Sequence, residues 1–144
     1  MTALLANFLF QHLQGAPQSQ SRFIRIDQFG YCTSIKIAVI VDLEIRFDAD
    51  DCFNPSIGES QYRVPRWSDD AVVFTGTLQV RNGGTILAKN GDLGWYFDFS
   101  DFIDPGRYYI YDLTNEVGSY GYDIESTAYN PLMYHASRFY YYLR

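Results

Sequence analysis

The candidate catalytic or metal-binding side chains of this sequence are carboxylates, because aspartates cluster in the segments between its apolar runs. Two facing carboxylates can act as general acid and base in hydrolysis, and grouped carboxylate oxygens can bind calcium. The aspartates are Asp48, Asp50, Asp51, Asp69, Asp70, Asp98, Asp101 and Asp104. The run from Asp48 to Asp51 lacks the glycine and the distant glutamate of an EF-hand loop. Loop aspartates at this density usually form turns and supply solubilising charge, so we assign no catalytic or metal site to them.

The histidines and cysteines do not form a recognisable catalytic or zinc-binding motif either. His12 and His135 lie near opposite ends of the chain, and the sequence contains neither G-x-S-x-G nor H-E-x-x-H. Cys32 and Cys52 lack the C-x-x-C spacing of a zinc site. They could form a disulfide in an exported protein or lie separately in the core as small apolar residues. The residues therefore predict a chain that is not itself an enzyme, with no catalytic, cofactor-binding or metal-binding residue.

Tryptophan rings can stack on sugars, so both tryptophans are candidate carbohydrate platforms. Strand alternation puts Trp95 on the same face as Phe97 and Phe99, which is typical of a core strand. Trp67 lies in the polar segment Pro65–Asp70 and is the better candidate for an exposed sugar platform.

The elements that would position these residues are predicted to be β-strands. Their apolar runs are short, rich in β-branched and aromatic residues, and separated by turn signals such as Asp104-Pro105-Gly106. The predicted strands are Phe23–Ile26, Ile35–Val41, Gln61–Val64, Ala71–Thr75, Leu78–Val80, Trp95–Phe99, Tyr108–Tyr111 and Tyr120–Ile124. Such strands with no helical period between them favour an antiparallel β-sandwich, with a small barrel as the alternative. We place Ile35–Val41 at the centre of a sheet, because it is apolar almost without alternation.

The C-terminal segment Asn130–Arg144 is predicted to form a helix with two apolar sides. Asn130 is a suitable N-cap, and Pro131 suits the first helical position. One apolar stripe follows helical spacing, and Tyr134 and Tyr141 lie opposite it. The stripe comprises Leu132, Met133, Ala136, Phe139, Tyr140 and Leu143. No helix-ending residue follows, so we expect a junction between two parts of a longer protein.

The N-terminal segment Thr2–Gln14 has two interpretations. It fits a short amphipathic helix that begins at Thr2 and ends at Gly15 and Pro17. It also fits a degenerate secretory signal or an artificial extension, although no Lys or Arg precedes its apolar core. In both cases Ala16–Ser21 is predicted to be a polar linker.

Length and charge restrict the class of protein. A chain of 144 residues can form one domain with its own core. Its formal net charge is −6 with eleven basic residues, so no basic stripe is available for nucleic acid or an anionic membrane surface. No apolar run reaches the length of a spanning helix. We therefore expect neither a nucleic-acid nor a membrane partner.

Several motifs follow one another in a fixed order. They are Ile24–Tyr31 (IRIDQFGY), Lys36–Ile40 (KIAVI), Val73–Leu78 (VFTGTL), Asp98–Tyr108 (DFSDFIDPGRY) and Ser119–Ile124 (SYGYDI). They resemble I-R-x-N-Q-x-G-Y, K-x-A-V, V-x-x-G-x-L, D-F-S-x-x-x-x-P-G-x-Y and S-x-x-F-x-I. These patterns belong to the immunoglobulin-like domain that precedes the catalytic domain in glycoside hydrolase family nine, the family of cellulases and endoglucanases. Asp27 stands where that family usually has asparagine.

The resemblance continues into the C-terminal helix. Tyr129–Leu132 and Ala136–Arg144 are similar to Y-x-P-L and A-L-x-F-F-Y-Y-Q-R, which begin the first helix of the family's catalytic domain. Leu143 departs from the usual glutamine. The resemblance implies three parts. They are an N-terminal extension at 1–21, an immunoglobulin-like β-sandwich at 22–126, and a linker with the start of a catalytic-domain helix at 127–144.

The resemblance implies an accessory function. In the family one carboxylic acid protonates the leaving oxygen while a carboxylate activates water on the opposite face, which inverts the sugar. The D-A-G-D motif that supplies the base is absent from this sequence. We therefore expect the sandwich to brace the catalytic domain of an extracellular or periplasmic polysaccharide-degrading enzyme. A carbohydrate-binding module and a structural or adhesive immunoglobulin-like subunit are the alternatives.

Two parts of the chain are expected to meet the catalytic domain. The first comprises the motif residues Asp27, Gln28 and Tyr31. The second comprises the helix residues Tyr134, Phe139, Tyr140, Tyr141 and Arg144. Without its partner, the helix should either self-associate or fold back onto the sandwich, because exposed apolar patches tend to find another surface.

Overall fold

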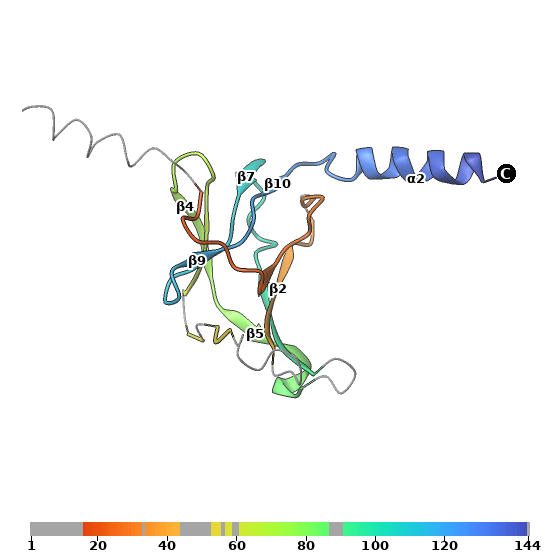
Figure 1. The fold of residues 1–144 in the computed structure, drawn as a ribbon. Helices are drawn as coiled ribbons and strands as arrows, with labels where there is room; N and C mark the ends of the chain where they lie inside the picture. The colour runs from red at the N-terminus through yellow and green to blue at the C-terminus, as the bar shows by residue number, and fades with distance from the viewer. Residues whose placement is uncertain are drawn as a thin grey trace, which may run out of the picture.

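Two layers of antiparallel strands face each other, and a helix extends away from them (Figure 1). The structure is a computed structural model that describes residues 16–32, 34–43, 53–55, 57–58, 61–86 and 91–143. The fold is the expected all-β immunoglobulin-like sandwich with a C-terminal helix. The two interpretations of Thr2–Gln14 concern a segment outside the described residues.

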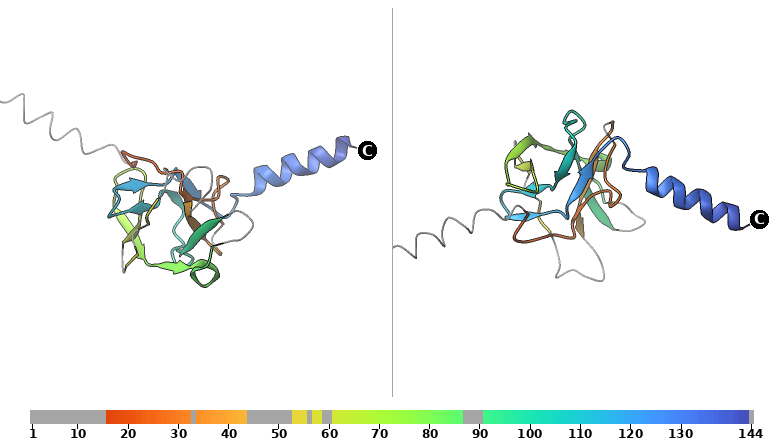
Figure 2. Two further views of the ribbon diagram at one scale, coloured as in Figure 1. Left: turned by 60° about the horizontal axis from the view of Figure 1, so that its bottom comes forward. Right: turned by 90° about the horizontal axis from the view of Figure 1, so that it is seen from above.

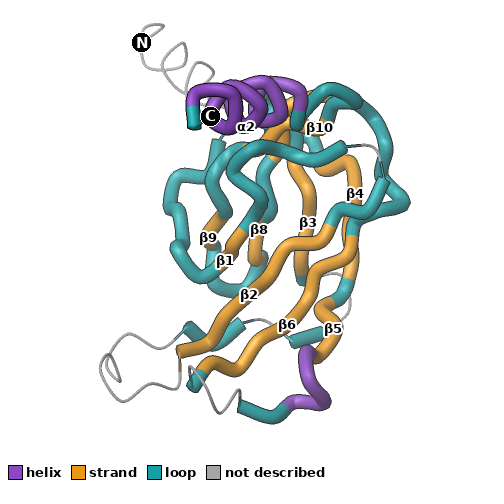
Figure 3. Tube along the Cα trace, turned by 90° about the vertical axis from the view of Figure 1, so that its right-hand side faces the viewer, coloured by secondary structure: helices purple, strands orange, loops and turns teal. Residues whose placement is uncertain are grey.

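The first layer is a sheet with strand order β1-β2-β6-β5. Its strands are β1 (Ile24–Arg25), β2 (Ile37–Leu43), β6 (Asp92–Asp98) and β5 (Leu78–Val80), and the 3₁₀ turn η1 (Arg81–Gly84) follows β5. β2 and β6 pair along their whole lengths, from Ile37 opposite Asp98 to Leu43 opposite Asp92. Figure 3 shows the two strands side by side. The prediction that the apolar run around Ile35–Val41 is central is confirmed, although its strand begins two residues later.

The second layer has strand order β4-β3-β8-β9. Its strands are β4 (Val72–Gly76), β3 (Tyr62–Pro65), β8 (Tyr111–Asp112) and β9 (Val117–Gly118). A ribbon of β7 (Gly106–Tyr108) and β10 (Tyr122–Ile124) adjoins β3 through a bridge between Arg66 and Tyr108. The predicted single strand Tyr108–Tyr111 is therefore two strands, because the chain changes partner between them.

Aromatic rings fill the space between the layers. Phe97 and Phe99 are fully buried, with ring centroids 5.8 Å apart. Phe97 also lies 5.7 Å from the ring of Tyr62, and Phe99 lies 5.5 Å from that of Tyr122. Trp95 exposes 6% of its surface. The prediction of one core face with Trp95, Phe97 and Phe99 is confirmed.

Two charged side chains are also fully buried, and each ties loops together. The Lys36 ammonium donates to the carbonyl oxygens of Ser34 and Ser100 at 2.8 and 3.0 Å. Burial lowers the pKa of this ammonium. Asp112 accepts from the Tyr62 hydroxyl at 2.6 Å and from two main-chain N–H groups of the turn that follows β8. Buried polar groups cost little only when they are satisfied in this way.

The predicted linker Ala16–Ser21 lies against the sandwich. Gln20 forms a parallel bridge with Gly118, and the Ser21 N–H donates to the Gly118 carbonyl oxygen at 2.8 Å. This close approach requires glycine, because a Cβ at residue 118 would lie 2.4 Å from the Cβ of Pro17. The segment therefore forms one edge of the second layer.

The helix α2 (Asn130–Tyr142) begins one residue earlier than predicted. Tyr129 rather than Asn130 is its N-cap, and Pro131 stands in its first turn as expected. Every described side chain of the helix is exposed, and in Figures 1 and 2 the helix points away from the sandwich. The fold-back alternative is therefore not observed, and both apolar sides are uncovered.

Truncation of Trp95 tests the core. We expect Trp95→Ala to lower the free energy of unfolding by about 3–5 kcal/mol, because the lost ring leaves a cavity between the layers. Ile103→Ala is the matched control, since Ile103 is 58% exposed, and it should change stability by no more than about 0.5 kcal/mol. Urea unfolding followed by circular dichroism measures both. Equal losses in the two variants would contradict the core assignment.

Candidate functional site

One carboxylate joins the first strand of the sandwich to the start of the helix. Asp27 lies two residues beyond β1, and its Oδ1 accepts the Phe29 N–H at 2.9 Å. Its Oδ2 accepts the Tyr129 hydroxyl at 2.8 Å, across 102 positions of sequence. Because Tyr129 is the N-cap of α2, this bond attaches the helix to the opposite end of the described chain.

Tyr31 connects this contact to the core. Its hydroxyl accepts the Asp27 N–H at 3.0 Å and donates to the Ile37 carbonyl oxygen at 3.2 Å. Its ring is buried and meets the rings of Phe99 and Tyr122 edge-on, with both centroids 5.2 Å away. The position of the Asp27 turn is therefore fixed by core packing.

The main chain around Tyr31 pairs with the segment that leads to the helix. The Tyr31 N–H donates to the Asp123 carbonyl oxygen at 2.8 Å, and the Glu125 N–H donates to the Tyr31 carbonyl oxygen at 3.0 Å. Gly30 permits this approach with φ +88°, since a Cβ there would lie 2.6 Å from the Asp123 oxygen. Two strand ends and the helix start are thus held at one place.

Both phenols of the site are stabilised in their neutral form. The hydrogen bond to Asp27 raises the pKa of Tyr129 to about 12, and burial raises the pKa of Tyr31 to about 12. An unperturbed phenol has a pKa of about 10. The stability that these phenols contribute is therefore complete below about pH 10 and is lost as the pH rises towards 12.

The predicted interface residues fall into two groups that Tyr129 links. In the sandwich, Asp27 is half-buried, Gln28 is exposed and Tyr31 is buried. On the helix, the exposed fractions are 60% for Tyr134, 61% for Phe139, 71% for Tyr140 and 71% for Tyr141. Arg144 lies outside the described residues. Sequence reasoning missed Tyr129 as a site residue, although it is the first residue of the motif Tyr129–Leu132. Contact of these residues with a second domain stays a prediction.

Trp67, the predicted sugar platform, is half-buried and engaged by its neighbours. The guanidinium carbon of Arg107 lies 5.1 Å from its ring centroid. The ring of Tyr109 meets it edge-on at 6.0 Å. A Cβ at Gly121 would lie 2.7 Å from the indole. These contacts occupy surface that a sugar would need, and a role in sugar binding stays a prediction.

The described aspartates of the loops make local contacts. Asp98 accepts the Ser100 N–H at 2.9 Å, and the hydrogen bonds from Ser100 lower the pKa of this carboxyl. Asp69 pairs with Arg66 at 2.8 Å. Among the residues that the structure describes, no group of three or more His, Cys, Asp or Glu could hold a metal ion. Cys32 is a free thiol, whereas Cys52 and the run from Asp48 to Asp51 lie outside the described residues.

Comparison with known families agrees with this geometry. The model of the cellulase N-terminal Ig-like domain matches residues 19–116. This chain belongs to that family. The match begins where the N-terminal segment joins the sandwich, and it confirms the resemblance seen in the sequence motifs. Among curated proteins, no significant match is found.

Solved structures of family nine contain the same fold. A Bacteroides ovatus GH9 protein is 22% identical with a TM-score of 0.59, over 83% of this chain and 18% of that protein. A metagenome-derived glycoside hydrolase family 9 endoglucanase is 27% identical with a TM-score of 0.61, over 82% of this chain and 20% of that protein. The chain thus spans about a fifth of the length of these proteins.

Titration of Tyr129 tests the Asp27 contact. We expect its ¹³Cζ resonance to remain that of a neutral phenol at pH 10.5 to 11, because the pKa is raised to about 12. In Asp27→Asn the titration should move down towards about pH 10, since the amide can donate to the phenolate. Tyr31 is the internal control, because burial is the main cause of its raised pKa. A wild-type Tyr129 that ionises near pH 10 would contradict the contact.

Proposed function

We propose that this chain is a non-catalytic module that braces the catalytic domain of a family-nine glycoside hydrolase. The observation that carries the proposal is the hydrogen bond from the Tyr129 hydroxyl to Asp27, at the N-cap of a helix whose own residues are all exposed. A brace needs a fixed attachment and a free apolar surface. The Asp27 carboxylate supplies the fixed attachment, and α2 supplies the free apolar surface.

The uncovered helix supports a protein partner of substantial apolar area. Among the large apolar side chains of α2, the exposed fraction ranges from 38% at Leu132 to 71% at Tyr141, and none of the described residues of the helix is buried. Burying apolar surface stabilises an interface by roughly 25 cal/mol per Å². We propose that the stripe with Leu132, Ala136 and Phe139 packs on one domain, while Tyr134 and Tyr141 meet the other.

The parent that we propose is an inverting, endoglucanase-like enzyme of polysaccharide degradation. The support is family membership together with the solved family-nine structures, one of which is an endoglucanase. In such an enzyme the acid and base carboxylates would belong to the catalytic domain, and this module would carry neither. Extracellular or periplasmic location follows from an insoluble polysaccharide substrate. None of the described helices is long and apolar enough to cross a membrane.

The isolated chain is expected to hydrolyse nothing, because its sequence lacks the D-A-G-D motif that supplies the family's base and contains no other recognised catalytic motif. Incubation with soluble cellulose derivatives, mixed-linkage glucan and chromogenic cellobiosides should release no reducing sugar. Turnover that survives repurification, and that disappears when one aspartate of this chain is changed, would refute a purely accessory role.

Bracing is tested in the longer protein that carries this chain. We expect Phe139→Ser with Tyr141→Ser to lower the unfolding temperature of the catalytic domain by several degrees, because a loss of about 2 kcal/mol shifts Tm by that amount. Ile86→Ser is the control, since Ile86 is 46% exposed and stands two residues after η1, the green turn that lies at the opposite end of the sandwich from α2 in Figure 1. Calorimetry measures the transitions. Identical transitions in wild type and the helix variant would reject the brace, and sedimentation of the chain alone reports whether the same residues drive self-association.

A further inference from the structure

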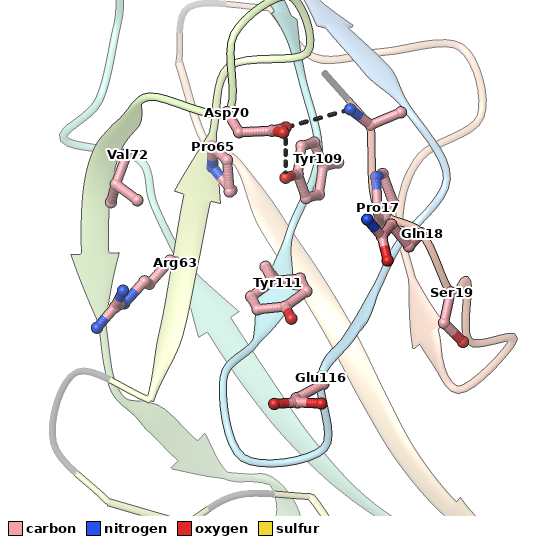
Figure 4. A pocket seen from close by; sticks show the side chains of 11 residues that line it. Pro17, Gln18, Ser19, Arg63, Pro65, Asp70, Val72, Tyr109, Tyr111 and Glu116 are labelled. Carbon is pink, nitrogen blue, oxygen red and sulfur yellow. Dashed lines mark hydrogen bonds between the residues drawn. The ribbon is translucent and has the colours of Figure 1, made fainter. Parts of the chain in front are cut away.

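A groove of about 740 Å³ lies against the second layer (Figure 4). Tyr62 and Val64 of β3 face the core, so Arg63 between them faces outward. Arg63 is paired across the strands with Tyr111 of β8. In Figure 4 the rings of Tyr109 and Tyr111 line the middle of the groove. The groove is therefore an aromatic surface on the outside of the sandwich, separate from the helix junction.

The walls of the groove are held in place by the protein itself. The segment 17–19 forms one wall, and the Gly118 N–H donates to the Ser19 carbonyl oxygen at 2.8 Å. At one end, Asp70 Oδ1 accepts the Ala16 N–H at 3.1 Å and the Tyr109 hydroxyl at 2.8 Å. These bonds shape the site before any ligand arrives, which reduces the entropy cost of binding.

Two charged side chains of the groove, Arg63 and Glu116, could form hydrogen bonds with a ligand. The Nε of Arg63 is buried and has no hydrogen-bond partner within the described part of the chain. This atom is covered by the protein, so a ligand in the groove would meet other parts of the half-buried Arg63 side chain. Glu116 lines the opposite side of Tyr111 with an exposed carboxylate. Its φ of +54° belongs to the hairpin turn between β8 and β9, where a left-handed residue is ordinary.

We propose that this groove binds a saccharide, with the ring of Tyr111 against one face of a pyranose. Sugar hydroxyls both donate and accept, so they can pair with the guanidinium of the half-buried Arg63 and with the carboxylate of Glu116 together. A phosphate would suit Arg63 but would be repelled by Asp70 and Glu116. A wholly apolar ligand would pair with neither the Arg63 guanidinium nor the Glu116 carboxylate. The choice of a β-1,4-glucan as the saccharide rests on the proposed function. The proposal that the groove binds a saccharide rests on the groove alone.

Titration of the full ¹⁵N-labelled chain with cellopentaose tests this proposal by NMR. We expect saturable shifts around Arg63, Tyr111 and Glu116. Tyr111→Ala should weaken binding at least tenfold, about 1.4 kcal/mol, because the stacking surface is lost. Tyr111→Phe keeps the ring and should retain most of the affinity, which separates stacking from a folding defect. Tyr120→Ala is the matched control, since Tyr120 is 58% exposed and lies outside the groove.

Several results would overturn the proposal. They are the absence of saturable shifts with cellopentaose, xylopentaose and mannopentaose, shifts that centre on Trp67, or unchanged affinity in Tyr111→Ala. Equal shifts with inorganic phosphate would assign an anion site instead. Binding of xylopentaose or mannopentaose in place of cellopentaose would keep the groove and reject the glucan. The titration uses no catalytic domain, so the absence of saccharide binding would not contradict the bracing proposal. Likewise, a negative calorimetry result would not contradict saccharide binding in the groove.

Discussion

The structure depends on the packing of aromatic rings between its two layers. Phe97 lies on β6 of the first layer, and its ring meets Tyr62 of β3 and Phe74 of β4 in the second layer at 5.7 and 6.1 Å. Phe99, directly after β6, meets Tyr122 of β10 at 5.5 Å. Short strands of two to seven residues cannot hold a sandwich by main-chain pairing alone. The rings supply the apolar burial that holds the layers together.

The same packing determines where the helix leaves the sandwich. Tyr31 buries its ring against Phe99, and its hydroxyl fixes the main chain of Asp27. Asp27 in turn holds Tyr129, the N-cap of α2. The start of the helix is therefore connected to the core through three side chains. A domain that continues from α2 would be oriented by these contacts rather than by a loose linker.

Sequence patterns predicted the elements that depend on local order. Alternation identified the core face of β6, and the long apolar run identified the central strand. The run was placed two residues too early because Lys36 is buried and Ile35 is 74% exposed, the reverse of their hydropathies. A hydropathy profile does not reveal that the Lys36 ammonium donates hydrogen bonds to the carbonyl oxygens of Ser34 and Ser100. β9 was missed because two residues, Val117 and Gly118, form no recognisable apolar run.

The contacts of the candidate site and of the groove were harder to predict because they join distant parts of the chain. Asp27 and Tyr129 both stand in motifs that were recognised, but their contact across 102 positions has no local signal. The groove depends on the N-terminal segment pairing with β9 at Gly118, where a side chain would collide with Pro17. That segment was predicted to be a linker, since its polar composition carries no strand period.

The two proposed surfaces are compatible because they lie on different sides of the sandwich. In Figure 1, β4 and β9, which border the groove, lie on the side away from α2. A domain that covers only the helix would leave the groove uncovered. The charges differ as well, since carboxylates of Asp70 and Glu116 flank the groove, whereas the exposed surface of α2 is mostly apolar. One surface thus suits a protein partner and the other a neutral polyhydroxy ligand, so the proposed bracing and the proposed saccharide binding do not compete for the same side chains.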